Sequence, residues 1–400
     1  MYTQSDYNVG NDSATTAAIA RVLAYLRIGE AEQQRLVDHC ARNIPRDRYV
    51  HPKLMSFSTE YKDERDEQFS KGAKERARLC VIYDRKGQKE AMLIHRHALS
   101  HLCEIAGLDG RYRAKLDVDS ADAWRRDLLA TNLKELFAKQ RFLNKLKREA
   151  EFLHRIVGNE LRAVLTQSYN RHLVSTAVLQ PFLAACQEVG LQPAKATVSD
   201  MKVHLQTYLP FAFQPVPGEF VAIGTCWTNS DFGEGKLRIS HSVLRLNGGG
   251  NLVTEDAFSR MHIGSVVQDT DMKLSDEVAI KELEAVAAAT RSAVLEAMTP
   301  DRVNLLLRAI QKAAEEKVPW YQMKDQLAKI LSKGDLDTIE GLLEAEIEDL
   351  PPPGVGSDGQ PLPSRWWAAA ALSHLAEKTA DPTKAMEIKA AAGSFLNSAK

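Results

Sequence analysis

The sequence predicts an α+β protein in which a central antiparallel β-meander packs against helices, with helical N- and C-terminal regions. Towards both ends of the chain, apolar residues recur at three- and four-residue spacing, as they do at Ile19, Val22 and Leu26. The middle third is instead rich in β-branched and aromatic residues, and apolar residues alternate there with polar ones. An antiparallel meander is the most economical topology for these consecutive strands.

The composition limits the classes of function that the chain supports. Its 400 residues are 44% apolar, which is enough for real hydrophobic cores and predicts two or three folded units. A formal net charge of -1 gives no overall attraction to nucleic acid or acidic membranes, so such binding must come from local clusters. No apolar run approaches the roughly 20 residues of a membrane span, and the polar N-terminal stretch does not look like a secretory signal. We therefore expect a cytoplasmic protein with no membrane partner.

Changes in composition divide the chain into five regions. Residues 1–90 form an N-terminal helical region with a hairpin, and residues 91–274 form the central α+β domain. The central domain opens with helices from residue 96 to about residue 157. Residues 275–350 are helical, with Ser275 as the expected N-cap of the first helix. A Pro/Gly linker at 351–364 precedes C-terminal helices at 365–400.

Two strands of the central domain are predicted to have one apolar and one polar face, because side chains of a strand point alternately to opposite sides. The first has Val203, Leu205 and Thr207 on one face and Lys202, His204, Gln206 and Tyr208 on the other. The second has Leu237, Ile239 and Val243 on one face and Lys236, Arg238 and Ser240 on the other. We expect the apolar faces to be buried and the polar faces to be wet.

The sequence contains no strong catalytic or metal-binding motif. His97 and His101 are one helical turn apart, but the general-base Glu of an H-E-x-x-H site is missing and no third ligand is fixed by spacing. The glycine-rich run 247–251 lacks the Gly-Lys-Ser/Thr ending of a phosphate-binding loop. The five cysteines form no C-x-x-C pair. We therefore predict no enzyme activity, no catalytic residue, no metal and no cofactor.

Basic residues gather in the segment from Lys134 to Arg171. It holds nine basic residues and four carboxylates, an excess of five positive charges that could neutralise phosphates. Aromatic residues such as Phe137 and Phe142 are interleaved with the basic ones. The ordinary alternative is an amphipathic helix whose aromatic residues are core and whose Lys and Arg residues are its solvated side.

Three stretches of the chain resemble a known family. They are 91–116, which begins "AMLIHRHALSHL", the run from Arg162 to Tyr169, and "GTCWTNSDFGEGKLRI", with Gly224, Asn229, Ser230, Gly233, Gly235 and Leu237 in a spaced pattern. From about residue 91 the chain is similar to a phage- and plasmid-borne family catalogued as domain of unknown function 932. It departs from many relatives at Leu246, where their Cys-x-Asn-Gly motif begins. The resemblance implies an accessory protein of a mobile element in a bacterial cytoplasm.

A second similarity concerns only the order of elements. The helix, meander and helix between Thr176 and Met298 resemble the layout of phage single-strand annealing proteins. This resemblance implies that basic groups on and beside the sheet hold the backbone of unpaired DNA. The glycines of the loop 230–235 would let a strand approach the backbone closely.

The sequence therefore predicts non-catalytic binding of single-stranded nucleic acid, with DNA preferred, in phage or plasmid replication, recombination or transcription. Phosphate contacts and stacking are assigned to Lys139, Arg141, Lys145, Arg162, Tyr169, Arg171, Lys202, Tyr208, Trp227, Lys236, Arg238 and Arg245. A phage or host replication or transcription protein and a homo-oligomer are left open as partners. Two alternatives stay open: a protein-interaction or host-inhibitory module that uses the acidic segment 335–350, and a hydrolase or nuclease with a site assembled from distant residues.

Overall fold

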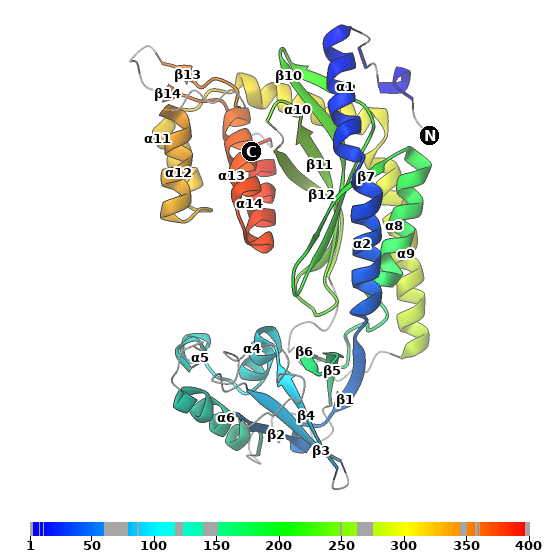
Figure 1. The fold of residues 1–400 in the computed structure, drawn as a ribbon, viewed down its shortest axis with the longest axis vertical. Helices are drawn as coiled ribbons and strands as arrows, with labels where there is room; N and C mark the ends of the chain where they lie inside the picture. The colour runs from blue at the N-terminus through cyan, green and yellow to red at the C-terminus, as the bar shows by residue number, and fades with distance from the viewer. Residues whose placement is uncertain are drawn as a thin grey trace.

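The computed structural model describes residues 3–7, 9–10, 12–59, 79–85, 88–116, 123–138, 151–248, 250–261, 275–344, 350–356, 359 and 361–396. Within them the chain forms a larger unit around a long sheet and a smaller unit around a second sheet, drawn above and below in Figure 1. Antiparallel strands and helical terminal regions confirm the predicted α+β class.

The sheet of the larger unit is the predicted meander. Its strand order is β12-β11-β10-β8-β7, and every neighbouring pair is antiparallel. A short strand, β9, pairs with β10 beyond the end of β8. The strands are β7 (Gln192–Val198), β8 (Val203–Tyr208), β9 (Phe213–Val216), β10 (Glu219–Asn229), β11 (Lys236–Arg245) and β12 (Asn251–Met261).

The apolar face of this sheet is buried as predicted. Leu205, Trp227 and Ile239 are opposite one another in register and are fully buried. They share a core with α8 (Ser175–Val189) and α9 (Asp276–Ala297), and the Trp227 ring lies 6.2 Å from that of Phe182.

The other face is wet only in part, because three helices cover most of it. α1 (Ser13–Leu26) packs over Tyr208, while α13 (Arg365–Lys378) and α14 (Pro382–Ser394) lie against β12 (Figure 1). α2 (Gly29–Arg42) runs along β7. The prediction of a wet face therefore fails at four residues, which are all buried: His204, Gln206, Tyr208 and Ser240. Alternation in sequence shows which residues share a face, but not what covers that face.

The smaller unit comprises the described residues between 46 and 165. Its sheet has the order β1-β5-β6-β4-β3-β2, with β1 (Arg46–Val50), β2 (Met55–Ser58), β3 (Cys80–Arg85), β4 (Gln88–Ile94), β5 (Phe152–Val157) and β6 (Glu160–Leu165). The helices α4 (Arg96–Ile105), α5 (Gly110–Leu116) and α6 (Ala123–Ala138) complete a separate hydrophobic core. The described residues between 46 and 165 thus form one unit, and the predicted boundary at residue 90 falls inside β4.

The helices predicted up to about residue 157 end earlier. Residues 152–157 form β5, because the side chains of Phe152, Leu153 and Ile156 are buried by pairing with β1 and β6. The sequence alone favours a helix that continues through these residues, because the charged residues that precede Phe152 follow a helical pattern. Tertiary pairing outweighs local propensity here.

The C-terminal third is helical, as predicted. It contains α9 and then α10 (Pro300–Glu315), α11 (Trp320–Leu327) and α12 (Lys333–Glu344) before α13 and α14. The expected linker instead carries a two-stranded sheet of β13 (Gly354–Val355) and β14 (Pro361–Leu362). Short 3-10 helices, η1 (Ser5–Tyr7) and η2 (Pro52–Leu54), occur near the N-terminus. Among the helices described, none has the length and apolar character needed to cross a membrane.

A buried arginine joins the two units. Arg155 of β5 is 0% exposed, and its Nε donates to Asp47 Oδ1 at 2.9 Å. Its Nη1 donates to the carbonyl oxygen of Asp231 after β10, and its Nη2 donates to that of Arg171 at 3.1 Å. One guanidinium thus holds acceptors from β1, from the loop after β10 and from the loop before α8, as its planar fork of donors allows.

The Asn-Ser-Asp stretch after β10 has a structural role at the same place. The backbone N–H of Ser175, at the start of α8, donates to Asp231 Oδ1 at 2.6 Å. The Ser175 hydroxyl donates to the same oxygen at 2.8 Å and accepts from Asn229 Nδ2 at 3.1 Å. The carboxylate satisfies an N–H at the positive end of a helix, which stabilises both the helix and the turn.

Candidate nucleic-acid interface

The three predicted stacking residues are core residues. Tyr169, Tyr208 and Trp227 are 1%, 0% and 0% exposed. The Tyr169 ring lies under the Arg155 guanidinium at 5.2 Å, and the Tyr208 hydroxyl bonds to Ser242 Oγ at 2.7 Å. A ring without an exposed face cannot stack on a base, so the prediction is wrong for all three.

Arg245 is also buried. Its side chain is 1% exposed, pairs with Glu219 at 3.1 Å and lies over the Trp366 ring at 5.7 Å. Its charge is compensated within the core, so its predicted phosphate contact is wrong. The sequence could not reveal this because Glu219 lies on the neighbouring strand, 26 residues earlier.

Two further predicted arginines form ion pairs beside the junction of the units. Arg162 pairs with Glu160 at 2.7 Å, and Arg171 pairs with Asp276 at 2.9 Å. Arg162 Nη1 also donates to the Asp200 carbonyl oxygen at 3.4 Å, in the loop before β8, but neither arginine lines the pocket that contains Lys202. Lys139, Arg141 and Lys145 lie outside the described residues.

Three predicted residues do come together. Lys202, Lys236 and Arg238 line one pocket of about 160 Å³ between the hairpin end of the large sheet and the first turns of α14. His204, Thr228 and Gly235 line it from the sheet, while Thr383, Met386 and Glu387 line it from α14. We call this site the α14 pocket. Lys236, Arg238 and His204 share the polar sheet face, as the alternation predicted.

The α14 pocket carries a small excess of positive charge. Lys202 pairs with Glu234 at 3.3 Å, and Glu387 is the other carboxylate at the pocket. Among the described side chains at the pocket, three cations thus face two carboxylates. His204 adds none near neutral pH, because burial and then the positive charge of Lys202 lower its pKa to about 3. Its Nδ1 forms a hydrogen bond with Thr228 Oγ1 at 2.8 Å.

The chemistry of the α14 pocket suits one phosphate group. Ammonium and guanidinium groups donate charge-assisted hydrogen bonds to phosphate oxygens. A volume of 160 Å³ is below the roughly 300 Å³ at which sites for whole small molecules begin. The pocket therefore fits a single phosphate of a longer ligand better than an enclosed nucleotide.

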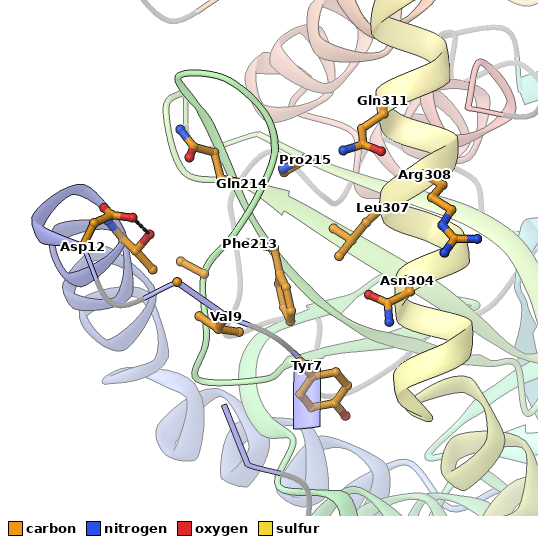
Figure 2. Close-up of a pocket in the computed structure, with 13 residues that line it drawn as sticks. Tyr7, Val9, Asp12, Phe213, Gln214, Pro215, Asn304, Leu307, Arg308 and Gln311 are labelled. Atoms are coloured by element: carbon orange, nitrogen blue, oxygen red, sulfur yellow. Dashed lines mark hydrogen bonds between the residues drawn. The ribbon is translucent and has the colours of Figure 1, made fainter. Parts of the chain in front are cut away.

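A larger concavity lies elsewhere in the molecule. Figure 2 shows this groove of about 490 Å³, with Asp12 on one wall, Arg308 of α10 on the other, and Phe213 of β9 between them. One carboxylate and one guanidinium give it no net charge, and no predicted site residue lines it. Its residues come from three segments far apart in the sequence, so no local motif could indicate it.

The histidine pair and the cysteines have structural roles. The rings of His97 and His101 lie 4.2 Å apart, but His97 Nε2 donates to the Phe232 carbonyl and His101 Nδ1 accepts from the Val164 N–H. Within the residues that the structure describes, no group of three or more His, Cys, Asp or Glu side chains could hold a metal ion. All five cysteines are buried, and burial raises the pKa of Cys40 and Cys186 to about 12.

Comparison with known proteins gives no further assignment: no protein-family model, no curated protein and no solved structure matches the chain. The resemblance found in the sequence motifs therefore stays a prediction.

Proposed function

We propose that the protein binds single-stranded nucleic acid, with DNA preferred, without catalysing a reaction on it. The observation that carries this proposal is the convergence of Lys202, from the loop before β8, with Lys236 and Arg238 of β11 on one pocket. The proposed interface contains fewer residues than the sequence predicted, because the buried aromatic residues and Arg245 take no part in it. Its role would be in replication, recombination or transcription of a phage or plasmid.

The shape of the α14 pocket favours an unpaired strand over a duplex. A duplex presents a rigid row of phosphates and needs a wide basic surface. The α14 pocket instead lies between a sheet end and a helix, and its basic residues are few. A flexible single strand can turn one phosphate into such a pocket and continue past it.

The acidic-segment alternative has less support. Asp335 at the start of α12 pairs with Lys384 of α14 at 2.8 Å, and Glu340 pairs with Lys324 of α11 at 2.8 Å. These two carboxylates hold α12 against its neighbours. Asp337 and Glu344 also belong to α12. The other acidic residues of the segment lie at 345–349, outside the described residues.

Titration of fluorescent single- and double-stranded oligonucleotides at several salt concentrations tests the proposal. We expect tighter binding of the single strand, and an affinity that falls as salt rises because counterions are released. Inorganic phosphate, added as a competitor, should displace the strand only at high concentration, because it fills the pocket without the strand's other contacts. No binding to either oligonucleotide at any ionic strength would refute the proposal.

A further inference from the structure

The structure exposes aromatic residues that the sequence analysis did not select. Among the described residues, three aromatic side chains are strongly exposed: Tyr112 at 39%, Trp124 at 59% and Tyr321 at 66%. Tyr112 and Trp124 lie on α5 and α6, which are neighbouring helices of the smaller unit. Single exposed apolar residues are ordinary on a protein surface, whereas a contiguous group of them marks an interaction site.

Trp124 begins a stripe of α6 that ends beside Tyr112 of α5. Trp124, Leu128 and Asn132 follow at four-residue spacing, so they share a face of the helix. Asn132 Nδ2 donates to the Tyr112 hydroxyl at 2.9 Å, which places Tyr112 at the far end of the stripe. Eight residues of helix separate Trp124 from Asn132 by about 12 Å along the axis. An unpaired strand can span this distance with two or three nucleotides.

Cationic groups accompany the rings. The Arg125 guanidinium lies 5.4 Å from the centroid of the Trp124 ring, and Arg111 and Arg113 flank Tyr112 in sequence. The connecting residues 117–122 carry three aspartates, so exposure of the rings, and not net charge, distinguishes this surface. Flat rings beside guanidinium groups are the combination on which unpaired bases stack.

We propose that Tyr112 and Trp124 form the base-stacking surface for the strand whose phosphate enters the α14 pocket. This inference rests on the proposed function and moves its stacking contacts from the large sheet to the smaller unit. In Figure 1, α5 and α6 lie on the same side of the view as α13 and α14. Leu128, 40% exposed between the rings, gives the bases an apolar surface.

Alanine substitutions test the stacking contacts directly. Trp124→Ala and Tyr112→Ala should each weaken binding of a single-stranded oligonucleotide about 5- to 150-fold, the range measured for loss of one stacked base. Tyr321→Ala is the matched control, because Tyr321 is the most exposed of the three rings and lies on α11. It should leave the affinity unchanged. The salt dependence should stay that of the wild type in all three, since no phosphate contact is removed.

Tryptophan fluorescence gives a second readout, which can be measured on the unmodified protein. Trp227, Trp366 and Trp367 are at most 1% exposed and Trp320 is partly buried, so Trp124 is the most accessible of the five tryptophans. The oligonucleotide should quench part of the emission and protect it from acrylamide. Both effects should be lost in Trp124→Phe.

The outcomes separate this inference from the proposed function. Wild-type affinity in Trp124→Ala and Tyr112→Ala, together with weaker binding in Lys236→Gln and Arg238→Gln, would refute the stacking surface and leave the α14 pocket in place. Absence of oligonucleotide binding by the wild type would refute both. Unchanged circular dichroism of the two alanine variants shows that any loss of affinity is not a loss of fold.

Discussion

At the scale of single residues, the side chains that sequence reasoning placed wrongly are those whose partners lie far along the chain. Arg155 meets Asp47 across 108 residues, and Arg245 meets Glu219 on the next strand. A guanidinium in the core is tolerated only with such partners, and pattern alone cannot identify them. The position of Lys236 and Arg238 on the polar face could be predicted, because they lie near the hairpin end of β11, where the pairing with β10 is regular.

Arg155→Met tests the role of the buried arginine. The substitution leaves Asp47 without its partner in a place with little water, so we expect a loss of about 3–5 kcal/mol in the free energy of unfolding. Arg291→Met is the matched control, because Arg291 pairs with Glu188 at 2.6 Å on the surface. That exposed pair should be worth less than about 1 kcal/mol. Urea denaturation of both variants measures the difference, and equal losses would contradict the account.

At the scale of elements, local signals located the ends of helices well. Ser275 accepts a hydrogen bond from the backbone N–H of Val278 as the expected N-cap of α9, and α8 ends at Gly190 in the left-handed conformation that glycine favours. The sequence could not predict which helix covers which sheet face, because covering depends on packing between distant segments. The α14 pocket forms because α14 lies against the polar face of the large sheet near the hairpin end of that sheet.

Gly393 shows how closely α14 approaches the sheet. A Cβ at this position would lie 1.9 Å from the carbonyl oxygen of Val253 in β12, so the helix must shift to admit a methyl group. Gly393→Ala should therefore cost about 1–3 kcal/mol, as overpacking does. Gly341→Ala, in α12 with nothing within 4 Å of the new methyl group, should instead stabilise the protein by about 0.4–1 kcal/mol. Thermal unfolding should show a lower melting temperature for Gly393→Ala and a higher one for Gly341→Ala. An unchanged melting temperature for Gly393→Ala would contradict the packing described.

At the scale of the whole molecule, the fold class followed from the sequence but the grouping of segments did not. The smaller sheet pairs β1 with β5 across about a hundred residues, and β4 lies parallel to β6. Such long-range pairing leaves no local trace in the sequence. The candidate site was predicted only where its residues belong to the meander, namely at Lys202, Lys236 and Arg238, while the exposed Tyr112 and Trp124 depend on tertiary packing.

The buried histidines predict how stability depends on pH. Burial lowers the pKa of His101, His154 and His204 to about 3, so the folded protein keeps them neutral where the unfolded chain protonates them. Their lowered pKa values mean that stability is full above about pH 6.5 and is lost as the pH falls towards 3, by about 1 kcal/mol per pH unit for each.

Melting temperatures between pH 8 and pH 4 check this dependence. The wild type should hold its melting temperature down to about pH 6.5 and lose it steadily below. His154→Asn should show a shallower decline, because His154 is 0% exposed and its Nδ1 bond to the Tyr83 hydroxyl can be replaced by an amide. A melting temperature that stays constant down to pH 4 would show that these histidines are not buried as described.

The most direct test of the α14 pocket is the slope of log affinity against log salt for a single-stranded oligonucleotide. Each phosphate contact contributes about 0.7 to that slope. Lys236→Gln combined with Arg238→Gln should make it shallower by about 0.7, because these two side chains hold the one phosphate that enters the pocket. Arg308→Gln combined with Lys312→Gln removes the same charge on α10 and should leave it unchanged. An unchanged slope in the pocket variant, or an equal change in both, would contradict the account.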